Sequence, residues 1–387
     1  MKILLVCTEK LPVPCIRGGA IQTYIDGILP YLSRHHECTV FSVADPELPE
    51  REIREGIRYV RAAAVNTDEY YHATAKFVAT EEWDWIVIYN RPKYLPLVAA
   101  AAPNSLFLLS MHNEMFHSHK IEPELARSCL ERVEKVITVS KFIANGIAHL
   151  FPEYEQKLQT VYAGVDLKRF QPRWFPEANK RRADLLAIHN LEDRQIVLSV
   201  GRLTDKKGPH LLLSAMVQVI EKHPSAVLLL VGSKWYGKNE DNDYVCKLKK
   251  QAKKLGESVQ LTGFIPPNKI QDYFLLGDIF VCASQWQEPL ARVHYESMAT
   301  GLCTITTERG GNPEVIIPEK NGLVIKDYEN PDAFAAKIDY LLSRPEERKE
   351  MGYRGRYLAE VNYSWSRVAS DILSILQIPQ KVNDSVC

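Results

Sequence analysis

The run Ile279-Phe-Val-Cys-Ala-Ser284 is followed, three residues later, by Glu288-Pro-Leu-Ala-Arg-Val-His-Tyr-Glu296. The first run is short and apolar, which predicts a buried strand over residues 279–284. The second run predicts a helix over residues 290–300. A buried strand that leads directly into a helix is the repeating unit of a parallel sheet with helices on its faces.

The same alternation continues in both directions from this unit. In the first half, apolar runs predict strands at residues 2–7, 37–43, 57–60, 85–89, 105–110 and 136–139. In the second half, they predict strands at 195–200, 226–231, 259–262, 303–306 and 322–324. Helical segments lie between them, at 20–33, 70–81, 123–133, 209–222, 244–255, 268–276 and 331–343. We therefore expect an α/β protein with two doubly wound, Rossmann-like domains.

The boundary between the domains should follow a predicted strand at residues 158–162. Residues 166–179 contain several prolines and charges and no clear period, which indicates a linker. We expect an N-terminal domain over residues 1–165 and a C-terminal domain over 166–363. The tail, 364–387, begins with an apolar pattern of helical period, and we expect this helix to cross back to the first domain.

Composition narrows the class of protein. The 387 residues carry a net charge of zero, which argues against nucleic acid as a partner. The apolar N-terminus has no signal-peptide cleavage site behind it, and no run approaches the length of a membrane span. The eight cysteines form no close pair, which favours a reducing compartment and disfavours a zinc site. We expect a cytoplasmic protein.

Two carboxylates of the opening stretch, Glu288 and Glu296, flank the predicted helix N-terminus. The free N–H groups and the dipole of such a terminus suit an anion. Glu288 would lie beside this anion site, and Glu296 about one and a half turns along the helix. The pattern fits a ligand with phosphate in its middle and hydroxyl-rich groups at both ends, and a nucleotide sugar has that shape.

A second motif, Gly201-Arg202-Leu-Thr-Asp-Lys-Lys207-Gly208-Pro209, lies between a predicted strand and a predicted helix. Arg202 and Lys207 would stand at the carboxyl end of the strand, where open α/β sheets bind ligands. Two fixed cations there can offset the charge of a diphosphate. A solvated polar loop is the alternative.

Two glycine pairs follow predicted strands. Gly18-Gly19 precedes the first helix, and Gly310-Gly311 follows the strand at 303–306. Glycine lets backbone N–H groups approach a phosphate or a sugar closely. Plain turns are the alternative for both pairs.

Isolated polar residues give weaker signals. His112 follows an apolar strand and could bond a sugar hydroxyl from the first domain, although a structural histidine fits equally well. His117 and His119 make a poor metal site, because no ligand-rich motif accompanies them. Asp241-Asn-Asp243 resembles a metal–diphosphate triplet, but a solvated loop with Asp243 as helix N-cap is favoured.

Taken together and in this order, the motifs resemble the family 4 retaining glycosyltransferases of the GT-B fold. The resemblance covers most of the chain. The matching residues are Gly18-Gly19-Ala20, Val139-Ser140-Lys141, Ala163-Gly164-Val165-Asp166 with Phe170 and Pro172, Gly201-Arg202 with Lys207-Gly208, Val231-Gly232, Glu288 with Glu296, and Gly310-Gly311 with Glu314. Any one motif is weak, but the ordered set is specific.

The resemblance implies two domains that face a cleft, with the acceptor on the first and the nucleotide sugar on the second. It implies that Arg202 and Lys207 hold the donor diphosphate, that Glu296 binds the ribose, and that Glu288 and His112 contact the donor sugar. The implied catalytic group is Arg202, Lys207, Glu288 and His112. The implied donor-binding group is Gly18, Gly19, Leu290, Ala291, Arg292, Glu296, Gly310 and Gly311. Family members generally need no divalent metal, so we expect no metal and no other cofactor.

The implied reaction moves a hexosyl group from a nucleoside diphosphate sugar, with uridine the expected base, to an acceptor hydroxyl with retention of configuration. The acceptor could be a glycan, a lipid-linked molecule or a small molecule, in cell-surface, polysaccharide or spore-coat glycan synthesis. Residues 232–239 look similar to members associated with the spore coat of spore-forming bacteria. A lysine-rich predicted helix most simply gives a solvated face, but it would also allow weak association with an anionic membrane or a coat polymer. Its lysines are Lys247, Lys249, Lys250, Lys253 and Lys254.

The chain departs from the family pattern at Leu290-Ala291, where Phe-Gly is usual. Alanine lacks the freedom of glycine at positive φ, which puts the local backbone geometry in question. This departure is the support for one alternative, a non-catalytic coat or scaffold protein that keeps the fold. A sugar-nucleotide epimerase of the same fold is the other alternative.

Overall fold

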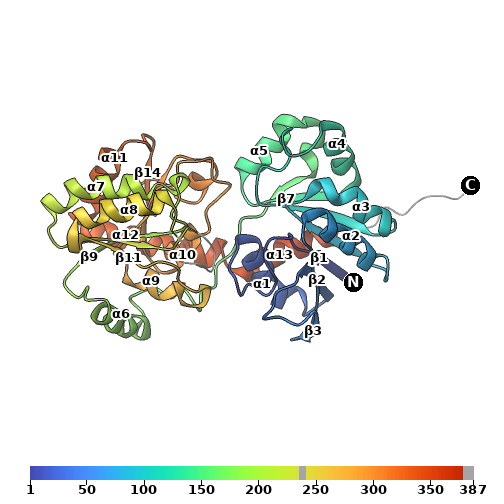
Figure 1. Cartoon of the computed structure of the whole chain (residues 1–387), viewed down its shortest axis with the longest axis horizontal. Coiled ribbons are helices and arrows are strands. Elements are labelled where there is room, and N and C mark those ends of the chain that lie inside the picture. Colours follow the sequence, from blue (N-terminus) through green and yellow to red (C-terminus); the bar gives the residue numbers. More distant parts are fainter. Residues whose placement is uncertain (235–240, 378–387) are drawn as a thin grey trace, which may run out of the picture.

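A computed structural model describes residues 1–234 and 241–377, which form two lobes side by side (Figure 1). The N-terminal lobe contains an eight-stranded sheet in the order β3-β4-β2-β1-β5-β6-β7-β8, and the C-terminal lobe a six-stranded sheet in the order β11-β10-β9-β12-β13-β14. Among the described strands, all pairings are parallel except that of the edge strand β3 with β4. The predicted pair of doubly wound sheets is confirmed.

The N-terminal lobe follows the predicted alternation. Its strands are β1 (Lys2–Val6), β2 (Glu37–Val43), β3 (Arg51–Arg54), β4 (Ile57–Ala62), β5 (Trp85–Tyr89), β6 (Leu106–Met111), β7 (Lys135–Thr138) and β8 (Leu158–Thr160). Its helices are α1 (Ala20–Leu32), α2 (Thr67–Val78), α3 (Leu95–Ala101), α4 (Pro123–Arg132) and α5 (Lys141–Leu150).

The C-terminal lobe begins after the linker. Its strands are β9 (Gln195–Val200), β10 (Ala226–Val231), β11 (Val259–Leu261), β12 (Ile279–Cys282), β13 (Cys303–Thr307) and β14 (Gly322–Ile325). Its helices are α6 (Pro176–Ile188), α7 (Pro209–Lys222), α8 (Asp243–Lys254), α9 (Ile270–Leu276), α10 (Val293–Ala299), α11 (Pro331–Leu342) and α12 (Pro345–Asn362).

Both faces of each sheet are covered, which explains why the strands are almost uniformly apolar. In β1, Ile3 and Leu5 face one apolar cluster, while the alternate residues Leu4 and Val6 face another. The same alternation divides β10 between the first of these clusters and a third. The first cluster is shared by the two lobes, so the apolar core continues through the joint between them.

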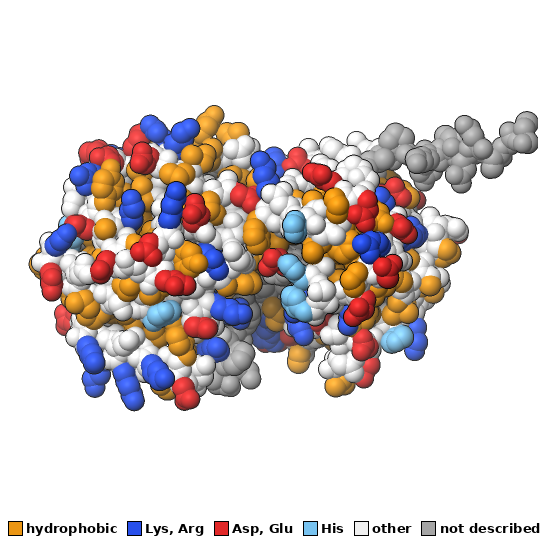
Figure 2. Space-filling view, turned by 90° about the horizontal axis from the view of Figure 1, so that it is seen from above, with side chains coloured by type: hydrophobic (Ala, Val, Ile, Leu, Met, Phe, Trp, Pro, Cys, Tyr) orange, Lys and Arg blue, Asp and Glu red, His pale blue; other side chains and the backbone are white. Residues whose placement is uncertain are grey.

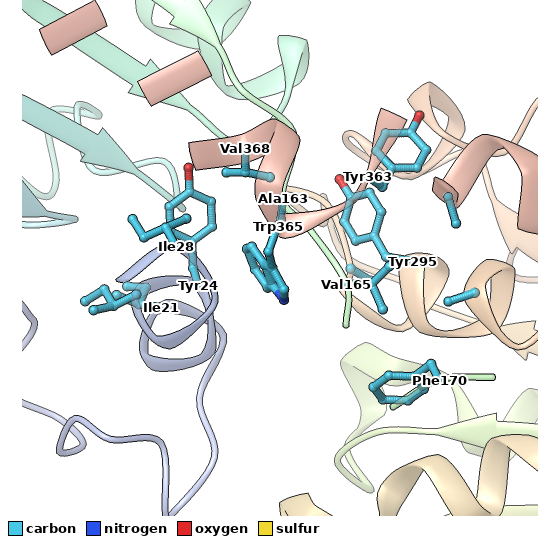
Figure 3. Close-up of a cluster of buried hydrophobic side chains, with 14 of the residues drawn as sticks. Ile21, Tyr24, Ile28, Ala163, Val165, Phe170, Tyr295, Tyr363, Trp365 and Val368 are labelled. Atoms are coloured by element: carbon cyan, nitrogen blue, oxygen red, sulfur yellow. The ribbon is translucent and has the colours of Figure 1, made fainter. Parts of the chain in front are cut away.

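The C-terminal helix α13 (Trp365–Leu376) crosses back onto α1, as the tail pattern predicts. Its first residue, Trp365, lies edge-on to Tyr24 of α1, with ring centroids 5.7 Å apart, at the joint between the lobes (Figure 3). A Cβ on Gly27 or on Gly164 would collide with this indole ring. Trp365 therefore fills a space that two glycines keep open. Residues 378–387 of the predicted tail lie outside the described residues.

Some expectations around the site and at α8 need correction. The helix predicted over residues 290–300 begins at Val293, so Glu296 lies in its first turn rather than farther along it. The N-cap of α8 is Asn242, whose side chain accepts from the backbone N–H of Val245; Asp243 is the first helical residue. The strand predicted over 279–284 ends at Cys282. The domain limits 1–165 and 166–363 stay a prediction.

None of the described helices combines the length and the apolar character that crossing a bilayer requires. Most of the segment 232–239, which looks similar to coat-associated proteins, lies outside the described residues.

Candidate active site

A cleft of about 780 Å³ lies between the lobes. Figure 2 shows the hollow between them from one side. The loops after β1, β5 and β6 form its N-terminal wall, and the loops after β9 and β12 with the start of α10 form much of its C-terminal wall. Both sheets therefore present the carboxyl ends of their strands, the edge at which such sheets bind ligands. The lining includes ten of the twelve predicted site residues: Gly18, Gly19, His112, Arg202, Lys207, Glu288, Leu290, Ala291, Arg292 and Glu296.

Glu288 is held in the cleft by three side-chain hydrogen bonds. Its Oε2 accepts hydrogen bonds from Lys207 Nζ at 2.5 Å, from Trp286 Nε1 at 2.7 Å and from Ser284 Oγ at 3.0 Å. Burial alone would raise the pKa of Glu288, but the charge of Lys207 and these hydrogen bonds outweigh it, so the pKa lies below its ordinary value. Oε1 makes no hydrogen bond to a described residue. One oxygen is thus fixed, and the other can accept from a ligand hydroxyl.

Glu296, the second acid, also has its own cation. Arg292 Nη2 donates to Glu296 Oε1 at 3.3 Å, one turn apart on the chain. The guanidinium and the carboxylate are both largely shielded from solvent. The two acids of the motif therefore occur as two ion pairs, Lys207–Glu288 and Arg292–Glu296, on one wall of the cleft.

The loop after β9 places Arg202 and Lys207 in the cleft. It closes in a short 3-10 turn, Asp205–Lys207, and continues into α7 through Gly208. Gly208 packs so closely on the Ala283 carbonyl oxygen, at the end of β12, that a Cβ there would collide with it. This contact holds the loop after β9 against the neighbouring loop that carries Glu288. The neighbouring Lys206 is exposed and does not line the cleft.

The loop at Leu290–Arg292, which precedes α10, has an ordinary backbone in spite of its departure from the family pattern. Ala291 is not among the described non-glycine residues with positive φ. Its carbonyl oxygen accepts from Nδ1 of the buried His294 at 2.8 Å, and its N–H donates to Asn312 Oδ1 at 3.2 Å. Alanine therefore needs no left-handed conformation here, and the loop is held by two side chains.

His112 is buried at the end of β6, on the opposite wall. Its Nε2 lies 3.1 Å from Ser110 Oγ, and its backbone N–H donates to Asn90 Oδ1 at 3.1 Å. Burial, assisted by the charge of Arg292, lowers the pKa of His112 to about 3, so the imidazole is neutral at neutral pH. Nδ1 makes no hydrogen bond to a described residue. A neutral ring can exchange hydrogen bonds with a sugar hydroxyl without adding a charge.

Gly18 and Gly19 line the cleft in front of α1, and both have positive φ, 89° and 106°. A Cβ on Gly19 would collide with Gln22 Oε1. The backbone here can be approached by a ligand and cannot easily be covered by a side chain.

Gly310 and Gly311 are not among the residues that line the cleft, contrary to the expectation of direct ligand contact. A Cβ on Gly310 would collide with the carbonyl oxygen of Glu288, and one on Gly311 with that of Pro289. The Gly311 N–H donates to the Glu288 carbonyl at 2.8 Å. The pair therefore supports the Glu288 loop from behind. Glu314 accepts from the backbone N–H groups of Lys141 and Phe142, which joins the two lobes.

Several residues of the site are not among those predicted from the sequence. Trp286 donates to Glu288, and Asn90 adopts a left-handed conformation, φ 57°, while it holds His112. Arg169 and Trp365 also line the cleft. The aromatic residue two positions before Glu288 was a usable signal, but the contributions of Asn90 and Trp365 depend on tertiary contacts.

A metal site is not evident in the described part of the chain, where no three His, Cys, Asp or Glu side chains gather so that they could hold an ion. Asp241 lies within 2.5 Å of Lys249 Nζ. The absence of a metal requirement stays a prediction.

Comparisons with known proteins agree with this geometry. Residues 18–169 match the family model described as Glycosyltransferase Family 4, and residues 182–358 match the model described as Glycosyl transferases group 1. The chain is 44% identical over 377 residues to spore coat protein SA of Bacillus subtilis, covering 97% of this chain and 99% of that protein. It is 40% identical to the putative glycosyltransferase YtcC of the same organism, covering 97% and 92%.

Solved structures show the same fold. The Anabaena protein Alr3699/HepE, in complex with UDP-glucose, superposes with a TM-score of 0.78 at 19% identity, covering 97% of this chain and 99% of that one. A glycosyltransferase from Rickettsia africae gives 0.80 at 22% identity, with 97% of each chain covered. At these identities the likeness establishes the fold.

Proposed function

Because this chain belongs to the group 1 and family 4 glycosyltransferases of the GT-B fold and is therefore a glycosyltransferase, we propose that it moves a hexosyl group from a nucleoside diphosphate sugar to an acceptor hydroxyl. One observation carries the proposal. The ion pairs Lys207–Glu288 and Arg292–Glu296 share one wall of an interlobe cleft with Arg202, opposite Gly19 and His112.

The donor fits this arrangement in three parts. Glu296, in the first turn of α10, binds the ribose hydroxyls. Arg202 and Lys207 take the diphosphate, with the Gly18-Gly19 backbone approaching from the other lobe. Glu288 offers Oε1 to the sugar, and His112 contacts the sugar from the opposite wall. Gly310 and Gly311 act indirectly, by holding the Glu288 loop.

The reaction exchanges one bond to the anomeric carbon for another. The bond from C1 to the β-phosphate oxygen breaks, a bond from C1 to the acceptor oxygen forms, and the acceptor proton passes to the leaving phosphate. The protein stabilises the charge of the departing diphosphate with fixed cations and orients both substrates. Glu288 is not assigned as a covalent nucleophile: its Oε2 is held by three hydrogen bonds, and its Oε1 is proposed to accept a hydrogen bond from the donor sugar. We propose that the configuration is retained and that no divalent metal takes part.

Uridine is the proposed base. It is supported by the structural neighbour solved with UDP-glucose, whereas a relative at 26% identity is named a GDP-mannose-dependent mannosyltransferase. A panel of UDP-, GDP- and ADP-linked hexoses, tested by thermal stabilisation, separates these options. We expect one UDP-sugar to raise Tm most, in the presence of EDTA as well as in its absence.

Three results would contradict the proposal. If none of the nucleotide sugars binds, the fold serves a scaffold. If a nucleotide sugar is converted to its epimer with no acceptor present, the protein is an epimerase. If EDTA abolishes transfer, a metal ion is required, and Asp241 and Asp243 become the candidate ligands. The ¹H NMR signal of the anomeric proton in the first turnover product reports retention or inversion.

The acceptor is proposed to belong to cell-surface, polysaccharide or spore-coat glycan synthesis. The 44% identical relative bears the name spore coat protein SA, which supports association with a coat. Fractionation of sporulating cells of the source organism tests this: recovery of the protein in the coat extract supports it, and recovery only in the cytoplasmic fraction contradicts it.

A further inference from the structure

The Arg292 side chain pairs with Glu296, and the proposed placement of the donor gives this side chain no contact of its own with the donor. Arg292 lies in the loop between Pro289 and α10 and lines the cleft. Its Nη2 donates to Glu296, and its side chain is 18% exposed. Arginine guanidinium groups carry a positive charge at every physiological pH.

The other terminal nitrogen of Arg292, Nη1, is buried and has no hydrogen-bond partner among the described residues. A buried N–H group of a cation that lacks an acceptor costs free energy, and native structures satisfy most such groups with protein, water or a ligand. Arg292 lines the cleft, so a small turn of its guanidinium toward a cleft-bound ligand would give Nη1 an acceptor.

Two neighbours fix the direction of this guanidinium. Glu296 holds Nη2 from the C-terminal lobe, and the Arg292 Cζ lies 5.6 Å from the centre of the Trp365 ring. Trp365 is itself wedged against Tyr24 (Figure 3), in the space kept open by Gly27 and Gly164. An aromatic face attracts and orients a guanidinium. Arg292 is therefore held at the joint of the two lobes.

The charge of Arg292 also acts on the opposite wall. It lowers the pKa of His112 and opposes the rise that burial produces in the pKa of Cys15. Cys15 belongs to the same loop as Gly19, and its Sγ lies 3.7 Å from the Gly19 carbonyl oxygen. The guanidinium thus stands across from the glycine pair proposed to approach the diphosphate.

We propose that the Arg292 side chain is a third cation for the donor diphosphate, donating from Nη1 while Nη2 remains on Glu296. This inference rests on the proposed function. The arrangement also solves an electrostatic problem, because a bare Glu296 carboxylate next to the diphosphate would repel it. Paired with Arg292, the acid can bind the ribose without opposing the phosphate. Arginine suits the task, since its planar fork serves two acceptors at once.

The test compares UDP, UMP and uridine as ligands of the wild-type protein and of Arg292→Gln and Arg292→Lys. Isothermal titration calorimetry measures the nucleotides, and ligand-observed NMR measures uridine. For Arg292→Gln we expect UDP to bind about 10- to 100-fold more weakly, the usual range for a lost charged hydrogen bond, and uridine to change less than about two-fold. Arg292→Lys should fall between, because it keeps the charge and loses the fork.

Arg354→Gln is the matched control. Arg354 also pairs with a glutamate one turn away, Glu350, at 2.8 Å, but it is exposed on α12 and does not line the cleft. It should leave all three affinities unchanged. If Arg292→Gln does not fold, as judged by circular dichroism and Tm, the affinities of Arg292→Lys are compared with those of the wild type instead.

Two results would overturn the inference alone. One is UDP affinity that is unchanged in both Arg292 variants. The other is equal weakening of UDP, UMP and uridine, which would mean that Arg292 acts only by positioning Glu296 on the ribose. Failure of the wild-type protein to bind UDP, GDP or ADP would instead overturn the proposed function, and the inference with it.

Discussion

The two walls of the cleft are built in different ways. The C-terminal wall carries charges that are already paired, Lys207 with Glu288 and Arg292 with Glu296, and its loops are held by buried contacts such as His294 to the Ala291 carbonyl. The N-terminal wall offers open backbone at Gly18 and Gly19 and one neutral imidazole, His112.

This difference indicates which of the two substrates, the donor or the acceptor, meets the more rigid wall. A paired and buried constellation cannot shift without breaking its own hydrogen bonds, so it suits the invariant part of the proposed donor, the nucleoside diphosphate. The N-terminal wall also carries Lys10, Arg17, Arg91 and Lys120 on loops. Loops of this kind can change with the acceptor while the wall proposed to bind the donor stays constant.

The largest expected effect comes from breaking the C-terminal wall. Arg202→Ala and Lys207→Ala should each lower kcat/KM for transfer by about 100- to 1,000-fold, because each removes a cation from the charge that develops on the leaving diphosphate. Initial rates with a saturating acceptor measure this. Lys206→Ala, one residue away and outside the cleft lining, is the control. A wild-type rate in either variant, with Tm preserved, would show that the substituted residue does not stabilise the diphosphate.

The second effect tests the neutrality of the N-terminal wall. The pKa of His112 is about 3 in the folded protein, against about 6.5 for an ordinary histidine. Because the unfolded chain binds a proton at His112 at a higher pH than the folded protein does, acid favours unfolding. The stabilisation from the neutral His112 is therefore complete at pH values above 6.5 and is lost as the pH falls from 6.5 toward 3. We expect His112→Asn to reduce the loss of unfolding free energy between pH 6.5 and 5 by ~2 kcal/mol.

Urea unfolding of wild-type protein and His112→Asn across this pH range measures the difference, which isolates His112 from the other histidines. If the free energy of unfolding depended on pH in the same way for both proteins, His112 would have an ordinary pKa and would be positively charged in acid.

The smallest expected effect concerns the open backbone of the N-terminal wall. Gly19→Ala adds a Cβ at φ 106° that collides with Gln22, so the loop must shift. We expect KM for the donor to rise about 10-fold, the equivalent of ~1.4 kcal/mol, with little change in KM for the acceptor. Gly256→Ala is the control, since its φ is also positive but its surroundings are open and lie outside the cleft lining. An unchanged donor KM would show that this backbone does not approach the donor.

Much of the fold follows from the sequence because buried parallel strands are continuous apolar runs. β2 and β5 were predicted with their observed limits. β3, with the sequence Arg-Glu-Ile-Arg, was missed because an edge strand can be almost entirely charged. The helices α6 and α12 were missed as well, since their many charged residues obscure the apolar stripe that a helix buries.

The candidate site was predictable where motifs carry it and not where tertiary contacts do. Ten predicted residues meet in one cleft, whereas Gly310 and Gly311 lie behind it, because a glycine needed for close backbone packing looks the same in sequence as one that approaches a ligand. The late start of α10 could not be seen either, since it depends on the hydrogen bonds of Ala291 to His294 and Asn312.

The central claim is that fixed cations of the C-terminal wall grip a sugar-linked diphosphate between the lobes. A crystal structure with a non-hydrolysable UDP-sugar tests it most directly. We expect diphosphate oxygens within hydrogen-bond distance of Arg202 and Lys207, the ribose on Glu296 and a sugar hydroxyl on Glu288 Oε1. A nucleotide bound outside this cleft, or a diphosphate held by a metal ion at Asp241 and Asp243, would contradict the claim.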